Sequence, residues 1–220
     1  MSLQLLPAAL FDRYHIEERR HACAILKDDF PSELQEIIDC LNNFKLLRSE
    51  IEEGGGRKSK IASRFDDFLS GRRVGGVFEG GRGWREEQTK VSRMIGDKTV
   101  ESVTHRVDLC KGRVAVEVEW NNKDPFFARD LNAFRMLHEL DVISVGVIIT
   151  RMDALQRIFD RLRDKNGEPC GRKYGASTTH WSKLMPHVEN GAGGSCPLLL
   201  VGINAGCYED DVEGAASSPS

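Results

Sequence analysis

Apolar residues recur at three- and four-residue steps in two long stretches of the chain, which is the spacing of an amphipathic helix. The first stretch covers residues 28–43, where Pro31-Ser32 is a typical helix start. The second follows Asp124-Pro125 and keeps one apolar face as far as Leu140. A shorter helix is predicted over residues 154–163. These three segments are the expected helical cover of the protein.

In the centre of the chain the pattern changes to the two-residue alternation of β-strands. Strands are predicted over residues 102–109 and 113–120, joined by a tight turn at Cys110-Lys111-Gly112. In the second strand, valines alternate with small or acidic residues. Residues 142–149 and 197–203 carry no charge and are typical of strands buried on both faces. A hairpin followed by helix, strand, helix and strand predicts an α/β domain with a mixed central sheet flanked by helices.

The length of 220 residues fits one domain rather than two. We expect an N-terminal helical segment, residues 1–57, packed on a core of residues 58–206 that carries the functional loops. Residues 207–220 are the expected flexible tail. With 40% hydrophobic and 30% charged residues, no membrane-length apolar run and no basic, apolar leader, the chain is predicted to be cytoplasmic and to make no use of a membrane.

Charge and cysteine content narrow the choice of function. The formal net charge of −3 argues against a purely electrostatic DNA-binding protein, but it does not exclude an enzyme that acts on DNA. The six cysteines contain no Cys-x-x-Cys pair, so we expect reduced core thiols rather than disulfides or a zinc site. The glycine pairs Gly75-Gly76 and Gly80-Gly81 do not lead into the Lys-Ser/Thr of a phosphate-binding loop. No nucleotide cofactor is therefore expected.

Acidic residues gather on the predicted hairpin. Glu117 and Glu119 are two residues apart on one strand, so they share a face at a separation of about 7 Å. The neighbouring strand brings Asp108 within reach of Glu117. Three carboxylates in a small volume repel one another, and a hard divalent cation such as Mg²⁺ offsets that repulsion. From spacing alone, the same residues also fit the solvated face of an amphipathic sheet.

The order of Val107-Asp108 and Glu117-Val118-Glu119 resembles the Asp…Glu-x-Lys signature of the PD-(D/E)XK nuclease superfamily. The acidic triplet continues as Trp-Asn-Asn and is followed by a helix and by Val-Gly-Val-Ile-Ile-Thr at residues 145–150. This order looks more narrowly like the BglII/BamHI group of type II restriction endonucleases. Residues 83–87 and 199–202 also fit that group's order.

The resemblance covers roughly residues 58–203 and implies a PD-(D/E)XK restriction-endonuclease-like fold with that segment as the nuclease core. It also implies a homodimeric enzyme that binds double-stranded DNA, cuts a short palindromic site with Mg²⁺ and leaves 5′-phosphates. A hexamer with a GATC centre is the expected site. By resemblance, Asp108 and Glu117 hold the metal, helped by the backbone carbonyl of Val118. The helix over residues 126–140 is the expected dimer element.

Two further acids are assigned by the same resemblance. Glu119 stands where most of the superfamily has lysine, and its role stays open between a proton acceptor and a direct contact of the attacking water. Glu87 resembles an acid on an upstream helix that supplies a further metal or water contact, with the neighbouring Glu86 as the alternative. The predicted catalytic residues are therefore Asp108, Glu117, Glu119 and Glu87.

Two segments are candidates for reading DNA bases. Asn121 and Asn122 follow the acidic strand, and an amide can form a bidentate pair with adenine in the major groove. The same pair also fits an ordinary turn. The basic loop over residues 170–181 is expected to lead into a helix capped by Ser177 or Thr178, and it also fits a plain surface loop. Its predicted DNA contacts are Arg172, Lys173, Ser177, Thr178 and Thr179. Candidate phosphate contacts are Arg57, Lys58, Lys60, Arg72, Arg73 and Arg82.

Two other hypotheses use the same residues. One is a structure-selective or repair nuclease on the same core, which would cut without reading a sequence and would reduce plasmids to a smear. The other is a non-catalytic DNA- or protein-binding module, whose carboxylates are only a polar sheet face and which would cut nothing with Mg²⁺.

Overall fold

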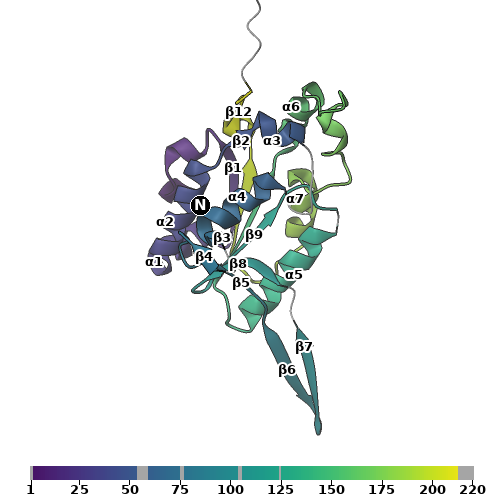
Figure 1. The fold of residues 1–220 in the computed structure, drawn as a ribbon. Helices are drawn as coiled ribbons and strands as arrows, with labels where there is room; N and C mark the ends of the chain where they lie inside the picture. Colours follow the sequence, from purple (N-terminus) through teal and green to yellow (C-terminus); the bar gives the residue numbers. More distant parts are fainter. Residues whose placement is uncertain (1, 54–58, 75–76, 104–105, 124, 213–220) are drawn as a thin grey trace, which may run out of the picture.

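The computed structural model describes residues 2–53, 59–74, 77–103, 106–123 and 125–212, and it centres on one six-stranded sheet (Figure 1). Its three middle strands run parallel, and the remaining strands pair antiparallel with their neighbours. The predicted mixed sheet is therefore confirmed. Across the sheet the order is β1 (Tyr14–Arg19), β11 (Leu198–Ile203), β10 (Val145–Arg151), β9 (Val114–Glu119), β8 (Val107–Lys111) and β5 (Arg85–Glu87).

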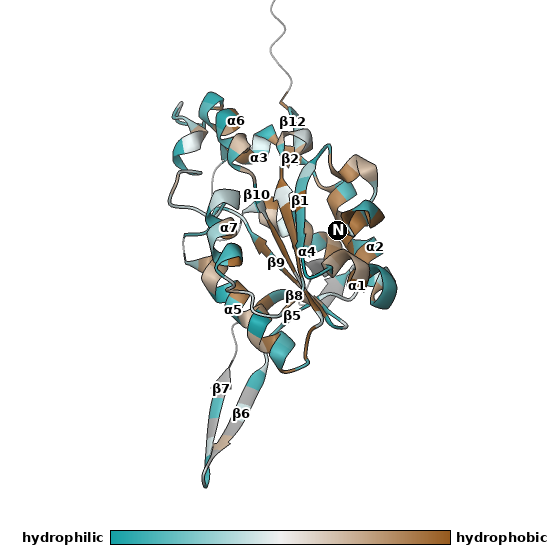
Figure 2. Cartoon of the chain, turned by 180° about the vertical axis from the view of Figure 1, so that it is seen from behind, coloured by the Kyte–Doolittle hydropathy of each residue, from teal (hydrophilic) through white to brown (hydrophobic). Residues whose placement is uncertain are grey.

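Helices cover both faces of this sheet. The first four helices share one buried core with the valines of β9, and α5 and α7 share a second core with Ala115 on the opposite face. The central strands are thus enclosed, and Figure 2 shows them as a hydrophobic band between the helices. The helices are α1 (Ala22–Asp29), α2 (Pro31–Asn43), α3 (Arg48–Glu53), α4 (Lys60–Leu69), α5 (Phe126–Glu139), α6 (Gln156–Arg161) and α7 (Trp181–Glu189).

Several short strands and 3-10 turns lie outside the central sheet. The most prominent is a hairpin of two strands, β6 (Lys90–Ile95) and β7 (Lys98–Val103), which projects away from the sheet between β5 and β8 (Figure 1). The other small strands are β2 (Leu46–Leu47), β3 (Arg72–Val74), β4 (Val77–Glu79) and β12 (Tyr208–Glu209). Single 3-10 turns occur at Leu3–Leu5, Ala8–Leu10, Asp153–Leu155, Cys170–Arg172 and Ala205–Cys207.

The helix predicted over residues 28–43 covers the end of one helix, α1, and the whole of a second, α2. Phe30 between α1 and α2 has φ −131° and ψ 50°, outside the helical region. The cause is Pro31, because a proline disfavours the helical conformation in the residue before it. Pro31 itself is the first residue of α2, where its missing amide hydrogen costs nothing. The helix predicted over residues 154–163 is also shorter, a 3-10 turn followed by α6.

The predicted hairpin is present, but its turn and its surroundings differ from the prediction. Cys110 and Lys111 belong to β8 and pair with the start of β9, so the turn is Gly112-Arg113, in which Gly112 has φ 55°. The strand expected over residues 102–109 is divided between β7 and β8. All six residues of β9 are buried. This excludes the alternative that Glu117 and Glu119 are a solvated sheet face.

The terminal segments are built into the fold. From residues 1–57, β1 adds an edge strand to the central sheet beside β11, so this segment supplies more than helices. At the other end, β12 pairs with β2 and the Asp211 carboxylate accepts a 2.9 Å hydrogen bond from the Ser49 amide. The predicted tail is thus held at its start, and residues 213–220 lie outside the described ones. All six cysteines are buried and unpaired, as predicted.

No helix in the described part of the chain is both long and apolar enough to cross a bilayer.

Gly146 on β10 sets how closely α5 approaches the sheet. A Cβ atom at this position would lie 2.4 Å from Cδ2 of Phe134 on α5. Gly146→Ala is therefore expected to lower the free energy of unfolding by about 1–3 kcal/mol, the usual cost of overpacking a core, as measured by urea unfolding. Gly175→Ala is the matched control, since its Cβ would meet nothing nearer than 3.7 Å. Equal stability of the two variants would contradict this account of the α5 contact.

Candidate active site

Asp108 on β8 and Glu117 on β9 lie side by side. The antiparallel pairing of Leu109 with Val116 leads directly to these two residues. The backbone amide of Asp108 donates to Oε2 of Glu117 at 3.4 Å, and the two carboxyl groups also share a hydrogen bond. The predicted proximity of Asp108 and Glu117 is therefore confirmed. Glu117 is only 1% exposed, whereas Asp108 is half-buried.

Glu119 lies beside a fourth acid, Asp130 of α5. Both side chains are buried, and they share a hydrogen bond. The negative charge of Asp130 also acts on Glu117. The carboxyl groups of Asp108, Glu117, Glu119 and Asp130 thus form one acidic cluster between the sheet and α5.

Burial and mutual repulsion raise the pKa values of this acidic cluster. Burial is the largest cause for Glu117, and the charge of Asp108 adds to it, so the pKa of Glu117 lies well above its usual value. Burial and Asp130 raise the pKa of Glu119 to about 9. Burying carboxyl groups together is costly unless a cation or hydrogen bonds compensate. Perturbed groups that converge in this way are typical of functional sites.

Asp130 was not predicted as a site residue, because it is remote in sequence from the acidic residues of the hairpin. The signal lies in the pattern of α5, where Phe127, Leu131 and Phe134 form the buried face. Asp130 falls three residues after the first of these and four before the last, so a charge stands on the apolar face of a helix. Acids at such positions are rarely buried without a partner. Here the partner is the Arg129 guanidinium at 2.9 Å, and the neighbours that Asp130 repels are the two glutamates on β9.

Two hydrogen bonds and one ion pair from three neighbours hold Glu119 in place. The side-chain amide Nδ2 of Asn122 donates to Oε2 at 2.7 Å. The Arg129 guanidinium lies 3.5 Å from Oε1 and also pairs with Asp130 at 2.9 Å. The Thr150 hydroxyl of β10 donates to the backbone carbonyl of Glu119 at 2.9 Å. Both carboxylate oxygens of Glu119 therefore have an assigned neighbour.

Glu87 lies on the edge strand β5 and not on a helix as predicted. It pairs with Val107, the residue before Asp108, and its charge helps to raise the pKa of Cys110 to about 12, although burial is the larger cause. Glu86 instead forms an ion pair with Arg106 at 3.3 Å, in which both side chains are exposed. Of the two acids, Glu87 is thus the one whose charge reaches the hairpin. The strand is three residues long and shows no periodicity of its own, so only its pairing with β8 defines it.

The acidic cluster fits Mg²⁺ through a small number of protein ligands. The described residues hold no group of three or more His, Cys, Asp or Glu side chains arranged around one metal position. Magnesium takes only one or two carboxylates and fills its remaining positions with water and phosphate oxygens. Oε1 of Glu117 is buried without a hydrogen-bond partner among the described residues, and Asp108 lies beside it. Asp108 and Glu117, with the backbone carbonyl of Val118 between the two glutamates, therefore suit a magnesium ion.

The loop over residues 170–180 folds back onto the end of β9. The Thr179 amide donates to the carbonyl of Asn122 at 2.8 Å, and the Asn122 amide donates to Oγ1 of Thr179 at 3.1 Å. Lys123 and Thr178 form a β-bridge beside this pair. The two base-reading candidates, the Asn-Asn pair and the basic loop, are therefore adjacent in the structure, which the sequence did not indicate.

Arg151 at the end of β10 holds the same loop from inside. Its guanidinium is buried and donates to the carbonyl of Tyr174 at 2.6 Å and to Oγ1 of Thr178 at 3.1 Å. The Tyr174 ring stacks on Phe159 of α6 with ring centroids 4.2 Å apart. The middle of the loop is thus fixed by a buried cation and an aromatic contact, which leaves its tips to face solvent.

Exposure divides the predicted DNA contacts into two groups. Ser177 is exposed, Lys173 is half-buried, and the Arg172 side chain is 74% exposed beside Glu168. Thr178 and Thr179 are buried and use their hydroxyls within the loop. Neither Ser177 nor Thr178 caps α7 as expected. That helix begins after His180, and Asp153 accepts the Ser182 amide at 3.1 Å in place of a local cap.

A comparison with protein-family models matches residues 14–203 to the family described as restriction endonuclease BglII/BglIII. The chain belongs to this family of restriction endonucleases. The match begins at β1, upstream of the segment in which the sequence resembles the BglII/BamHI group. The protein is accordingly a type II site-specific deoxyribonuclease that binds double-stranded DNA. No curated protein matches the chain.

Two of the candidate phosphate contacts of this restriction endonuclease interact with other residues of the chain. Lys60 pairs with Glu53 at 2.5 Å. Arg82 donates to the carbonyl of Phe68 at 3.1 Å, and its guanidinium lies 3.8 Å from the centre of that ring. Both cations are therefore engaged within the fold. Outside the described part of the chain lie Arg57, Lys58 and the side chains of Arg72 and Arg73.

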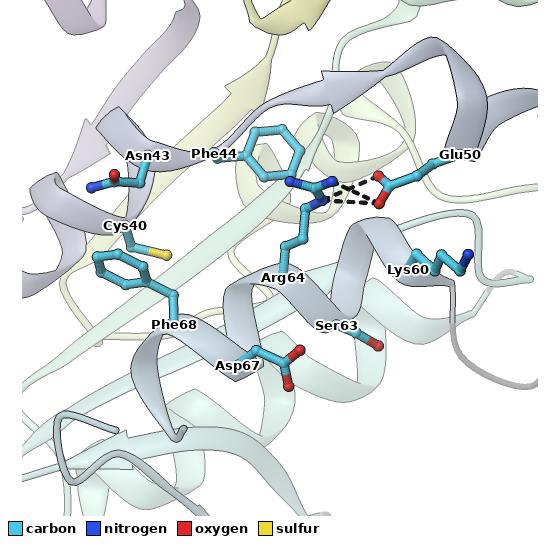
Figure 3. A pocket seen from close by; sticks show the side chains of 9 residues that line it. All are labelled: Cys40, Asn43, Phe44, Glu50, Lys60, Ser63, Arg64, Asp67 and Phe68. Carbon is cyan, nitrogen blue, oxygen red and sulfur yellow. Dashed lines mark hydrogen bonds and ion pairs between the residues drawn. The ribbon is translucent and has the colours of Figure 1, made fainter. Parts of the chain in front are cut away.

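A cavity of about 600 Å³ lies among α2, α3 and α4 (Figure 3). Arg64 and Glu50 face each other across it and form an ion pair at 2.8 Å. Two cationic and two acidic side chains line the cavity, so its charge favours neither an anionic nor a cationic ligand. Because these helices pack against the valine face of β9, the cavity is separated by the sheet from the acidic cluster of the restriction endonuclease. Of the residues predicted to contact metal, bases or phosphates, Lys60 alone lines it, and Lys60 is paired with Glu53.

Proposed function

We propose that this restriction endonuclease is a Mg²⁺-dependent homodimer that hydrolyses both strands of a short palindromic site and leaves 5′-phosphates. The observation that carries the proposal is the acidic cluster, in which half-buried Asp108 of β8 lies beside buried Glu117 of β9, whose Oε1 has no hydrogen-bond partner among the described residues. A hexamer with a GATC centre remains the expected site on the strength of the family resemblance alone. Six reduced thiols and a DNA substrate suit a cytoplasmic enzyme.

In this proposal, Asp108, Glu117 and the carbonyl of Val118 hold the metal. When bound, magnesium would supply Lewis-acid activation of the scissile phosphodiester and of a water molecule. Glu119 then accepts a proton from the attacking water or orients it by direct contact. Its fixed position between Asn122 and Arg129 supports either role. Water attacks the scissile phosphorus and displaces the 3′ oxygen, so that one fragment ends in a 3′ hydroxyl and the other keeps the phosphate on its 5′ end.

Glu87 has an indirect role in this proposal. Its place on β5 beside Val107 supports an indirect contact, through water, with a metal or phosphate near Asp108. Asp130 is the additional acid of the cluster. Because it lies behind Glu119 on α5 and is fully buried, it acts on the glutamates rather than on DNA.

We further propose that DNA is read by the accessible residues at the end of β9 and in the adjoining loop. Asn121, Arg172, Lys173 and Ser177 have the exposure and the donor groups that base edges and phosphates require. The direct DNA contacts predicted for Thr178 and Thr179 are not carried forward, since their hydroxyls support the loop. A homodimer follows from the palindromic site, because a two-fold axis in the protein then matches that of the DNA; the predicted dimer element, α5, stays a prediction.

Digestion of a panel of plasmids tests this function. With added Mg²⁺ we expect discrete fragments whose mapped ends share one palindromic sequence and carry 5′-phosphates. With EDTA we expect intact plasmid. A smear would instead support a structure-selective nuclease, and the absence of any Mg²⁺-dependent cutting would support a binding module.

A further inference from the structure

Asn122 connects two parts of the endonuclease that carry different tasks in the proposed function. Its backbone exchanges two hydrogen bonds with Thr179 of the loop, at 2.8 and 3.1 Å. Its side-chain amide donates to Oε2 of Glu119 at 2.7 Å. One residue therefore bonds through its main chain to the DNA-reading loop and through its side chain to the acidic cluster.

The surroundings leave little freedom at this connection. Asn121, the residue before it, has φ 59°, which fixes a sharp change of direction immediately after β9. Thr179 is fully buried, and the Thr178 hydroxyl is bonded to the buried Arg151. On the other side of Glu119, Arg129 approaches the second carboxylate oxygen at 3.5 Å. A displacement of the loop by DNA is therefore passed to Asn122 rather than absorbed locally.

We propose that Asn122 is a positioning residue that links the loop over residues 170–180 to Glu119, so that DNA seated on the loop sets the orientation of the Glu119 carboxylate. This proposal rests on the proposed function, because it takes Glu119 as part of the catalytic machinery. It assigns Asn122 a role in the rate of strand cleavage, in place of the direct base contact predicted from the sequence. Thr179, which has no exposed surface, acts through Asn122.

Replacing Thr179 tests the link without touching any DNA-facing atom. Thr179→Val keeps the shape of the side chain but removes the oxygen that accepts the Asn122 amide. We expect the single-turnover cleavage rate, at saturating protein and with the mapped site as substrate, to fall about 10–100-fold, the usual effect of losing a residue that orients a catalytic group. Thr179→Ser keeps the oxygen and is expected to restore most of the rate.

Asn122→Ala provides a second test at a half-buried position where misfolding is a smaller concern. Its saturated rate should fall by a similar factor, and the double variant with Thr179→Val should show less than the product of the two losses. Asn43→Ala, an exposed asparagine on α2, is the matched control and should cleave like the wild type. Thermal melting of every variant verifies that the protein is folded at the assay temperature.

The saturated rate decides the outcome. If Thr179→Val and Asn122→Ala cleave at the wild-type rate once saturated, whatever their affinity for DNA measured with calcium in place of magnesium, the link is refuted and Asn122 is at most a base-reading residue. A loss of rate that Thr179→Ser does not restore also refutes it. If the wild-type endonuclease cuts at a mapped site, the results for the variants test the Asn122 link alone. If the wild type produces no mapped site, the proposed function itself has failed.

Discussion

Replacing Glu117 with glutamine or alanine is expected to reduce Mg²⁺-dependent cleavage by about 1,000-fold or more, while DNA binding is retained. The physical reason is that Glu117 has the buried oxygen without a partner and lies beside Asp108. Loss of this charge removes the centre of the proposed metal site. The measurement is the single-turnover cleavage rate on the mapped site, together with DNA affinity measured in calcium.

Glutamine is the more informative substitution at this position. It keeps the volume of the side chain and cannot ionise, so it places no charge beside Asp108 and Asp130. The variant should therefore be folded and at least as stable as the wild type without metal. Glu139→Ala, which removes an exposed carboxylate at the end of α5, is the matched control. Undiminished cleavage by Glu117→Gln would exclude the acidic cluster as the catalytic centre.

The metal-free endonuclease is expected to lose stability as the pH rises, because of the same acidic cluster. In the unfolded chain the carboxyl of Glu119 ionises at its ordinary pKa of 4.5, whereas in the folded protein its pKa is about 9. Between these values the folded protein binds more protons than the unfolded chain. The free energy of unfolding therefore falls with rising pH, at about 1.4 kcal/mol per pH unit for each such group. Below pH 4.5 the group is protonated in both states and contributes no pH dependence.

Urea unfolding between pH 5 and pH 9 in EDTA measures this effect. The wild type should lose several kcal/mol over the range, an order-of-magnitude figure that follows from the slope above. Glu119→Gln should show a flatter profile, since it cannot ionise. Added Mg²⁺ should restore stability at the alkaline end, because a cation favours the ionised carboxylates. Parallel profiles for wild type and variant would show that Glu119 is not held in its protonated form.

These two results together separate chemistry from folding. A carboxyl that is required for cleavage and that also lowers the stability of the metal-free protein is retained for its function rather than for the fold. Asp130 belongs to the same test, since its charge contributes to the raised pKa of both glutamates.

Local sequence pattern determined the centre of this site. The alternation of valines with acids in β9 fixed which side chains share a face, because successive residues of a strand point to opposite sides. The predicted hairpin brought Asp108 within reach of Glu117, but the register that places the two opposite each other, with Leu109 paired to Val116, was given only by the structure. The buried strands β10 and β11 and the helix α5 were equally visible in the sequence, because each is long and strongly patterned.

Other parts of the site had no local signal. Glu87 was expected on a helix and lies on β5, because a three-residue strand is defined by its hydrogen bonds to β8 and not by its own pattern. The helix start at Pro31 was predicted correctly, whereas the separate helix α1, which ends at Asp29, was not predicted. In the loop over residues 170–180, composition favoured DNA contacts, but it did not distinguish buried Thr178 and Thr179 from their exposed neighbours.

The sequence by itself determined the mixed sheet and the shared face of Glu117 and Glu119, because both follow from periodicity, and it placed Asp108 within reach of Glu117. Only the tertiary structure decided that Asp130 joins them, that Asn122 bonds to Glu119, and that the loop of Thr179 lies against the end of β9. Those contacts depend on how closely α5 packs on the sheet at Gly146 and on where a long loop is anchored by Arg151. Packing distances between elements remote in the chain leave no trace in the spacing of residues along it.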